Sequence, residues 1–121
     1  DVLSYQLTET MDNEIYRLIY SMLVSQFNLE AQVIHFYYFL QESNIQWHND
    51  GSHSAGATIY LNQKWNKKDG GFFLYQKKNE DISIVMPEMN KCVFQSGAVA
   101  HATTPTFNHS PVRKSIQVFF K

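Results

Sequence analysis

The sequence predicts a mainly β fold, a β-sandwich or jelly roll, with one helix ahead of the strands. Aromatic residues make up 15% of the 121 residues, a composition that favours half-buried strands. About eight short β-rich runs, separated by turn residues, fill the chain from about residue 32 onward. Only the segment before them has a helical spacing of apolar residues. One helix followed by many short strands is typical of a sandwich or jelly roll and not of alternating βαβ units.

The N-terminal segment predicts a short strand over residues 2–7 and then a helix. Thr10 or Asp12 is suited to cap this helix, which extends to about Phe27. Its apolar side chains recur at i, i+3, i+4, i+7 and i+8 and therefore share one face. These residues are Ile15, Leu18, Ile19, Met22 and Leu23. We expect this face to pack against a sheet.

The remaining strands are expected where β-rich runs alternate with turn signals. They cover residues 32–40, 45–48, 56–61, 71–75, 82–86, 92–95, 100–107 and 112–120. A chain of this length fits one small domain, so residues 1–121 are expected to form a single domain. The sequence begins with Asp1 and not with Met, which leaves open an N-terminal extension of the natural chain.

Charge and composition exclude several classes of partner. Ten Lys and Arg residues against eleven Asp and Glu residues give a net charge of −1, which offers no footprint for nucleic acid and no polybasic patch for a membrane. No apolar stretch reaches the roughly 20 residues of a membrane helix.

Cys92 is the single cysteine, so an intracellular, cytoplasmic setting is expected, with the thiol buried among apolar neighbours. Nothing in the sequence indicates an oligomeric state.

Three residues form a candidate metal site. His48 and Asp50 lie two positions apart, so in a strand or its flank their side chains point to the same side. His101 begins another expected strand and can supply a third ligand. Two histidines and one carboxylate make up the facial triad of non-haem iron(II) oxygenases. A catalytic zinc site is also chemically possible, whereas a structural zinc site would need four ligands and usually several cysteines.

Arg113 and Ser115 help to distinguish these metals. They share one face of the last expected strand, opposite the apolar side chains of Ile116, Val118 and Phe120. A lone Arg on such a strand is costly to bury without an anion, and a guanidinium beside a hydroxyl can bind a carboxylate. A 2-oxoglutarate site needs this anchor. A zinc hydrolase does not, and the sequence lacks the His-Glu-x-x-His arrangement of such enzymes.

At these residues the sequence resembles the prolyl 4-hydroxylase branch of the iron(II)/2-oxoglutarate oxygenases. It is similar above all to the hypoxia-inducible-factor prolyl hydroxylases and their bacterial relatives. The similarity extends from about the expected helix to the C-terminus. The segments that carry it are Trp47-His48-Asn49-Asp50, Ile59-Tyr60-Leu61-Asn62-Gln63-Lys64-Trp65, Asp69-Gly70-Gly71, Met86-Pro87, Val93-Phe94, His101 and Pro111-Val112-Arg113-Lys114-Ser115-Ile116.

The resemblance implies a double-stranded β-helix, a distorted jelly roll, with the helix packed outside. It also implies roles for the individual side chains of the site. The implied ligands of iron(II) are His48, Asp50 and His101. The implied partners of the distal 2-oxoglutarate carboxylate are Arg113 and Tyr60, and we place Ser115 beside them. Tyr38 matches a family tyrosine near the cosubstrate, and the neighbouring Tyr37 competes for this match.

The implied activity is that of a 2-oxoglutarate-dependent dioxygenase. It would use iron(II), 2-oxoglutarate and dioxygen, with ascorbate as a further cofactor, and hydroxylate a proline in a protein or peptide. The same chemistry on a free amino acid or another small molecule is the alternative. A non-catalytic, cupin-like metal-binding module is an alternative of a different class. Thr58 and Thr103 replace apolar residues of the closest relatives, which leaves the shape of the pocket open.

Overall fold

A computed structural model of the chain describes residues 2–6, 17, 21, 25 and 30–121. Within these residues it contains nine β-strands and one short 3₁₀ helix, η1 (Lys67–Asp69). The prediction of a mainly β fold is therefore confirmed. The helix expected between Thr10 and about Phe27 lies outside the described residues, apart from three isolated positions. Within the described part, no helix is both long and apolar enough to cross a membrane.

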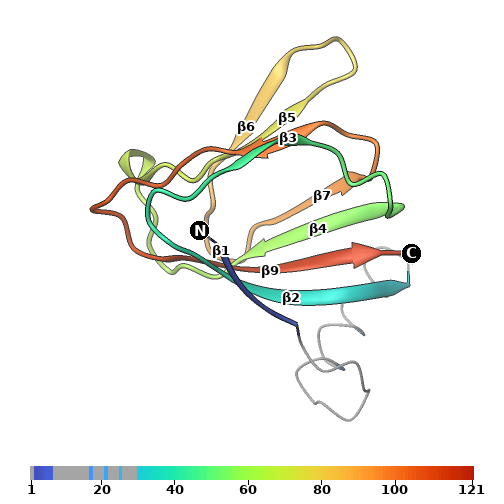
Figure 1. Cartoon of the computed structure of the whole chain (residues 1–121), viewed down its shortest axis with the longest axis horizontal. Coiled ribbons are helices and arrows are strands. Elements are labelled where there is room, and N and C mark those ends of the chain that lie inside the picture. Colours follow the sequence, from blue (N-terminus) through green and yellow to red (C-terminus); the bar gives the residue numbers. More distant parts are fainter. Residues whose placement is uncertain (1, 7–16, 18–20, 22–24, 26–29) are drawn as a thin grey trace.

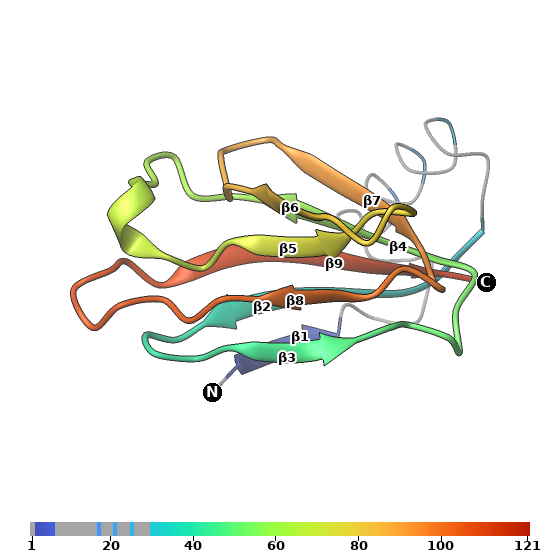
Figure 2. The ribbon, with the colours of Figure 1, turned by 90° about the horizontal axis from the view of Figure 1, so that it is seen from above.

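The strands form two antiparallel sheets that make up the two layers of Figure 1, and Figure 2 shows them from above. The five-stranded sheet has the order β1 (Val2–Gln6), β2 (Ala31–Phe39), β9 (Arg113–Phe120), β4 (Ala55–Tyr60) and β7 (Cys92–Ser96). The four-stranded sheet has the order β3 (Ile45–His48), β8 (His101–Thr103), β5 (Phe73–Gln76) and β6 (Ile82–Val85). The chain passes between the sheets several times, so residues far apart in sequence meet between them.

β9 shows how the alternation of side chains divides the larger sheet. Val118 is fully buried, and it pairs with Ile34 of β2 and Ala57 of β4. These residues belong to the apolar core cluster on one face of the sheet. Burial of such an aliphatic side chain contributes about 1.5–3 kcal/mol. The other face of β9 carries Arg113 and Ser115, which share a face as expected from the sequence, and both are nearly inaccessible to solvent.

Two sequence-based expectations need correction. The strand expected over 100–107 is only three residues long, because Pro105 has no N–H to donate to a neighbouring strand. The chain leaves the sheet at Thr104, whose N–H still donates to the carbonyl of Phe72 at 2.9 Å. Cys92 is exposed, because it lies with Phe94 and Ser96 on the exposed face of β7, opposite the face that carries the buried Gln95.

Backbone hydrogen bonds join the connection between β4 and β5 to the connection between β8 and β9. Asn66 caps η1, and the buried Asp69 completes a capping box with it. Gly70 then forms a bridge with Thr106, and the N–H of Gly71 donates to the carbonyl of Pro105 at 3.1 Å. These contacts fix the loop that leads into Arg113 at the start of β9.

Candidate functional site

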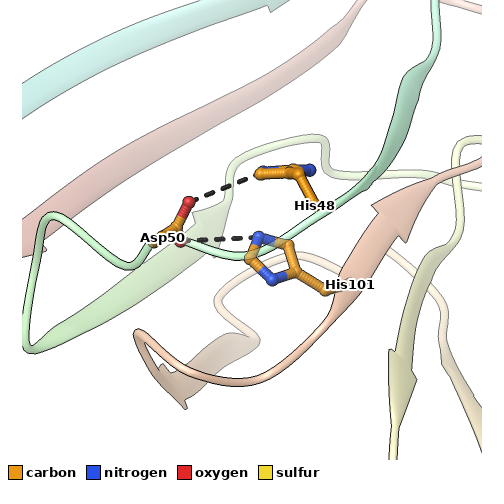
Figure 3. Close-up of side chains that lie close together, drawn as sticks. All are labelled: His48, Asp50 and His101. Carbon is orange, nitrogen blue, oxygen red and sulfur yellow. Dashed lines mark ion pairs between the residues drawn. The ribbon is translucent and has the colours of Figure 1, made fainter.

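The structure brings His48, Asp50 and His101 together at one end of the smaller sheet (Figure 3). His48 ends β3 and lies opposite His101, which begins β8, and their rings are 4.3 Å apart. Asp50 follows in the loop after β3. Its Oδ1 lies 3.5 Å from Nε2 of His48, and its Oδ2 lies 3.4 Å from Nε2 of His101. Three potential ligand atoms, one from each residue, lie within 4.8 Å of one another.

Backbone carbonyls orient both imidazoles. Nδ1 of His48 lies 2.7 Å from the carbonyl oxygen of Gln46, and Nδ1 of His101 lies 2.9 Å from that of Val99. A carbonyl oxygen only accepts hydrogen bonds, so in a neutral ring Nδ1 carries the proton and Nε2 keeps its lone pair. Both Nε2 atoms face Asp50. The arrangement therefore presents two imidazole lone pairs and a carboxylate to one point, which is the donor set of the two-histidine, one-carboxylate metal sites.

A cavity of about 110 Å³ lies between the two sheets and contains these three side chains. Its walls come from both layers, because the inward-facing residues of β2, β4 and β9 lie opposite β3, β5 and β8. The lining residues are Tyr37, Phe39, Ile45, His48, Asp50, Thr58, Phe73, Gln95, His101, Thr103, Arg113, Ser115, Gln117 and Phe119. Arg113 and Ser115 therefore share the cavity with the histidine–aspartate cluster.

Arg113 is a buried cation with an unfilled position. Its side chain is packed between two rings, with the guanidinium carbon 4.8 Å from the centre of Phe39 and 5.1 Å from that of Tyr60. Its Nε is buried without a hydrogen-bond partner among the described residues, and none of the ion pairs found there involves it. A buried guanidinium without an anion is unfavourable. Its surroundings therefore suit a bound carboxylate.

Two hydroxyl groups lie on the same side of the larger sheet as Arg113. The side chain of Tyr60 is completely buried beside Arg113, behind the residues that line the cavity, and its hydroxyl makes no hydrogen bond of normal geometry with the described residues. Burial raises the pKa of Tyr60, and the charge and the nearby side-chain donors of Arg113 oppose part of this rise. The phenol is thus neutral at ordinary pH and can donate a hydrogen bond. Ser115, 2% exposed, adds a second hydroxyl on the same side of β9 as Arg113.

The two tyrosines of β2 lie on opposite faces of the larger sheet. The structure does not bring Tyr38 to the cavity: it lines an open groove on the other face, with Phe36 and Leu40. Tyr37 lines the cavity instead. Burial raises the pKa of Tyr37, and the negative charge of Asp50 raises it further. Of the two candidates matched from the sequence, Tyr37 is the one near the site.

Some cavity residues were not singled out from the sequence. Phe73 stacks on His101 with ring centres 5.3 Å apart. Gln95 donates a hydrogen bond to Oδ2 of Asp50 at 3.3 Å, and Gln117 accepts one from Thr58. The strand alternation of β7 and β9 could have placed both glutamines on the inner face. Nothing in the sequence indicated which acidic or hydroxyl group each would meet.

Comparisons with solved structures place this fold among the oxygenases and cupins. A prolyl-4-hydroxylase from Pseudomonas putida is 20% identical, with a TM-score of 0.84 over 99% of this chain and 71% of that chain. A prolyl hydroxylase from Trichoplax adhaerens, solved with a hypoxia-inducible-factor peptide, is 14% identical, with a TM-score of 0.80 over 98% of this chain and 62% of that chain. A cupin superfamily protein from Desulfitobacterium hafniense is 10% identical, with a TM-score of 0.55 over 99% of this chain and 77% of that chain.

At these identities the structural likeness establishes the fold alone, and this chain spans about two thirds of the length of the two hydroxylases. No curated protein sequence matches the chain significantly. The family model described as 2OG-Fe(II) oxygenase superfamily, however, matches residues 32–121. This match covers most of the chain and includes every residue of the cavity. The chain therefore belongs to the 2OG-Fe(II) oxygenase superfamily.

Proposed function

We propose that this chain is an iron(II)- and 2-oxoglutarate-dependent dioxygenase that hydroxylates proline in a protein or peptide. The observation that carries the proposal is one cavity that contains both a histidine–aspartate cluster and a buried arginine that forms no ion pair with the residues described. In this proposal the two facing sheets form a double-stranded β-helix, and the site lies in its interior. The roles of the individual residues follow from the chemistry that each group offers.

The donor set at the cluster fits iron(II). His48, Asp50 and His101 offer two nitrogens and one oxygen, and three protein ligands leave coordination positions open for small molecules. A structural zinc site would instead be closed by four ligands. No other group of three potential ligands is found in the described part of the chain. We therefore assign these three residues as the ligands of iron.

The opposite wall of the cavity fits the distal carboxylate of 2-oxoglutarate. Arg113 can bind a carboxylate through two parallel hydrogen bonds, and its Nε is free to donate one. The buried hydroxyls of Tyr60 and Ser115 can complete the set. Because Tyr37 lines the cavity and Tyr38 does not, we replace the sequence-based choice of Tyr38 by Tyr37.

When bound, iron and 2-oxoglutarate together supply oxidation of an unactivated C–H bond by dioxygen, with succinate and carbon dioxide as co-products. The protein holds and orients these groups. Asp50 and the two imidazoles fix one end of the cavity. Arg113 fixes the other end, while the rings of Phe39 and Tyr60 that sandwich its guanidinium keep water from it. Water exclusion strengthens the attraction between Arg113 and a carboxylate.

The size of the cavity favours a substrate that approaches from outside. A volume of about 110 Å³ accommodates a small dicarboxylate and little more. His48 is the exposed member of the cluster, with 40% of its side chain accessible against 7% for His101. A substrate therefore meets the site from the His48 side. A proline on a peptide suits this approach, and the hydroxylase folds found above support the same substrate class.

The proposal is tested by measuring succinate release with iron(II), 2-oxoglutarate and a library of proline-containing peptides, with mass spectrometry of the peptides. We expect succinate release to increase with a peptide that gains one oxygen atom on proline, and to vanish in His48→Ala. Oxidation of small molecules only would refute the peptide as substrate. Binding of iron without any 2-oxoglutarate decarboxylation, even uncoupled, would show a non-catalytic binding module and overturn the proposal.

A further inference from the structure

A glutamine in the cavity wall makes direct contact with the carboxylate of the metal cluster. Gln95 lies in β7 and is 7% exposed. Its Nε2 donates to Oδ2 of Asp50 at 3.3 Å, the same oxygen that lies 3.4 Å from His101. The contact joins the end of β7 to the loop after β3, over a separation of 45 residues. Gln95 is therefore placed to control how the Asp50 carboxylate is oriented.

The amide of Gln95 has only one favourable orientation here. If it were turned over, Oε1 would face the carboxylate of Asp50, and two acceptors would oppose each other without a proton between them. With Nε2 toward Asp50, Oε1 is buried without a hydrogen-bond partner among the described residues. A buried unpaired oxygen is unfavourable for folding. An apolar side chain would avoid this cost, so packing alone gives no reason for a glutamine.

The strand next to Gln95 is shaped to allow this contact. Gly56 of β4 lies directly opposite Gln95. A Cβ at this position would lie 2.8 Å from Nε2 of Gln95 and 3.3 Å from Oδ2 of Asp50. A glycine inside a strand weakens the strand and often marks a close approach of other groups. At Gly56, the absent side chain leaves the space in which the amide and the carboxylate meet.

The backbone of the same segment holds Asp50 as well. The N–H of Asp50 donates to the carbonyl of Gly97 at 2.9 Å, and the N–H of Gly97 donates to the carbonyl of Ser54 at 2.9 Å. A Cβ at Gly97 would lie 2.0 Å from the carbonyl oxygen of His53. The backbone of Asp50 is therefore fixed by Gly97, and its side chain is oriented by Gln95, two residues earlier in the same segment.

We infer that Gln95 is a positioning residue for the metal site: it holds the Asp50 carboxylate between the two imidazoles before the metal arrives. This inference rests on the proposed function, which assigns Asp50 as a ligand. A carboxylate free to rotate would lose the orientation that faces both Nε2 atoms. Outer partners of metal ligands typically contribute about 10–100-fold to metal affinity. We expect an effect of that size from the single hydrogen bond of Gln95.

The test is an anaerobic calorimetric titration of the metal-free protein with iron(II), which measures affinity without turnover. Gln95→Met keeps the length of the side chain but removes the donor, and we expect it to weaken iron binding about 10–100-fold. Thermal unfolding of the metal-free Gln95→Met protein should show unchanged or higher stability, because the unpaired Oε1 is gone.

Gln117→Met is the matched control. Gln117 is a glutamine of the same cavity wall, but its amide accepts a hydrogen bond from Thr58. It should leave iron affinity unchanged. Equal affinity in the wild type and Gln95→Met, or an equal loss in Gln117→Met, would overturn the role of Gln95 and leave the proposed function standing. A wild-type protein that binds no iron would overturn both.

Discussion

Replacement of Arg113 by methionine should strongly weaken the binding of 2-oxoglutarate while leaving the stability of the fold almost unchanged. A carboxylate bound by two charge-assisted hydrogen bonds gains about 1.5–3 kcal/mol from each. Loss of both therefore costs about 3–6 kcal/mol, which corresponds to a decrease in 2-oxoglutarate affinity of about 10²–10⁴-fold. In the protein without cosubstrate, the change removes a buried Nε that has no hydrogen-bond partner among the residues the structure describes, a gain of about 1–3 kcal/mol. It also removes two contacts with the rings of Phe39 and Tyr60, a loss of about 0.5–2 kcal/mol each.

These two contributions to folding nearly cancel, so Arg113→Met should unfold at almost the wild-type temperature. The affinity for 2-oxoglutarate is measured by calorimetry in the presence of iron(II) without oxygen, and stability by thermal unfolding of the metal-free protein. Lys114→Met is the control, because Lys114 neighbours Arg113 but is exposed on the other face of β9. A folded Arg113→Met protein with wild-type affinity for 2-oxoglutarate would refute the anion site. A large loss of stability would refute the view that the guanidinium lacks a stabilising partner in the protein without cosubstrate.

Three further predictions concern the surroundings of this cavity. Gly71→Ala should destabilise the fold by about 1–3 kcal/mol in urea unfolding. The reason is that Gly71 has φ +67° and that a Cβ there would lie 3.2 Å from Cδ of Arg113. If this variant binds 2-oxoglutarate as tightly as the wild type, the position of Arg113 does not depend on this loop. His48→Ala should weaken iron(II) binding by more than the roughly 100-fold expected for an outer partner, whereas His109→Ala, outside the cavity, should not alter it. Burial raises the pKa of Tyr60 above its usual 10.0. Above pH 10 the unfolded chain therefore releases a proton that the folded chain keeps, so the free energy of unfolding decreases as the pH rises further. Chemical unfolding at several pH values should show a smaller decrease of this free energy in Tyr60→Phe than in the wild type.

Most of the strand pattern could be predicted because the spacing of apolar residues reports burial directly. Residues 45–48 were expected as a strand, and β3 has these bounds. The error at 100–107 arose where a run of β-favouring residues continued past Pro105, which cannot take part in a ladder. The error at Cys92 arose because local sequence does not reveal which face of β7 is covered by the rest of the fold: Cys92 lies on the exposed face and Gln95 on the buried one. Sheet order is a long-range property: β9 lies between β2 and β4, which are far from it in sequence.

The chemistry of the site was more predictable than its fine geometry. His48, Asp50 and His101 could be proposed as a group because few side chains bind metals and their spacing suited a strand. The choice between Tyr37 and Tyr38 could not be made in the same way, because a shift of one residue reverses the face of a strand. The match to the family tyrosine favoured Tyr38, but the pairing of β2 with β9 puts Tyr37, opposite Ser115, on the cavity side. Gln95 could not be predicted as a site residue, because its contact with Asp50 spans 45 residues and no local sequence pattern indicates it.

The two sheets contribute different halves of the proposed site, and this division suits a ligand with two acidic ends. His48 and His101 belong to the four-stranded sheet, whereas Arg113 and Tyr60 belong to the five-stranded sheet. Facing sheets lie about 10 Å apart, so a small molecule that reaches both halves must bridge the gap between them. A monocarboxylate can satisfy either the metal or Arg113, but not both. Because the buried guanidinium forms no ion pair within the part of the chain that the structure describes, the proposed bridging ligand would supply the missing anion. Cosubstrate binding should therefore hold the two sheets together as well as prepare the site for reaction.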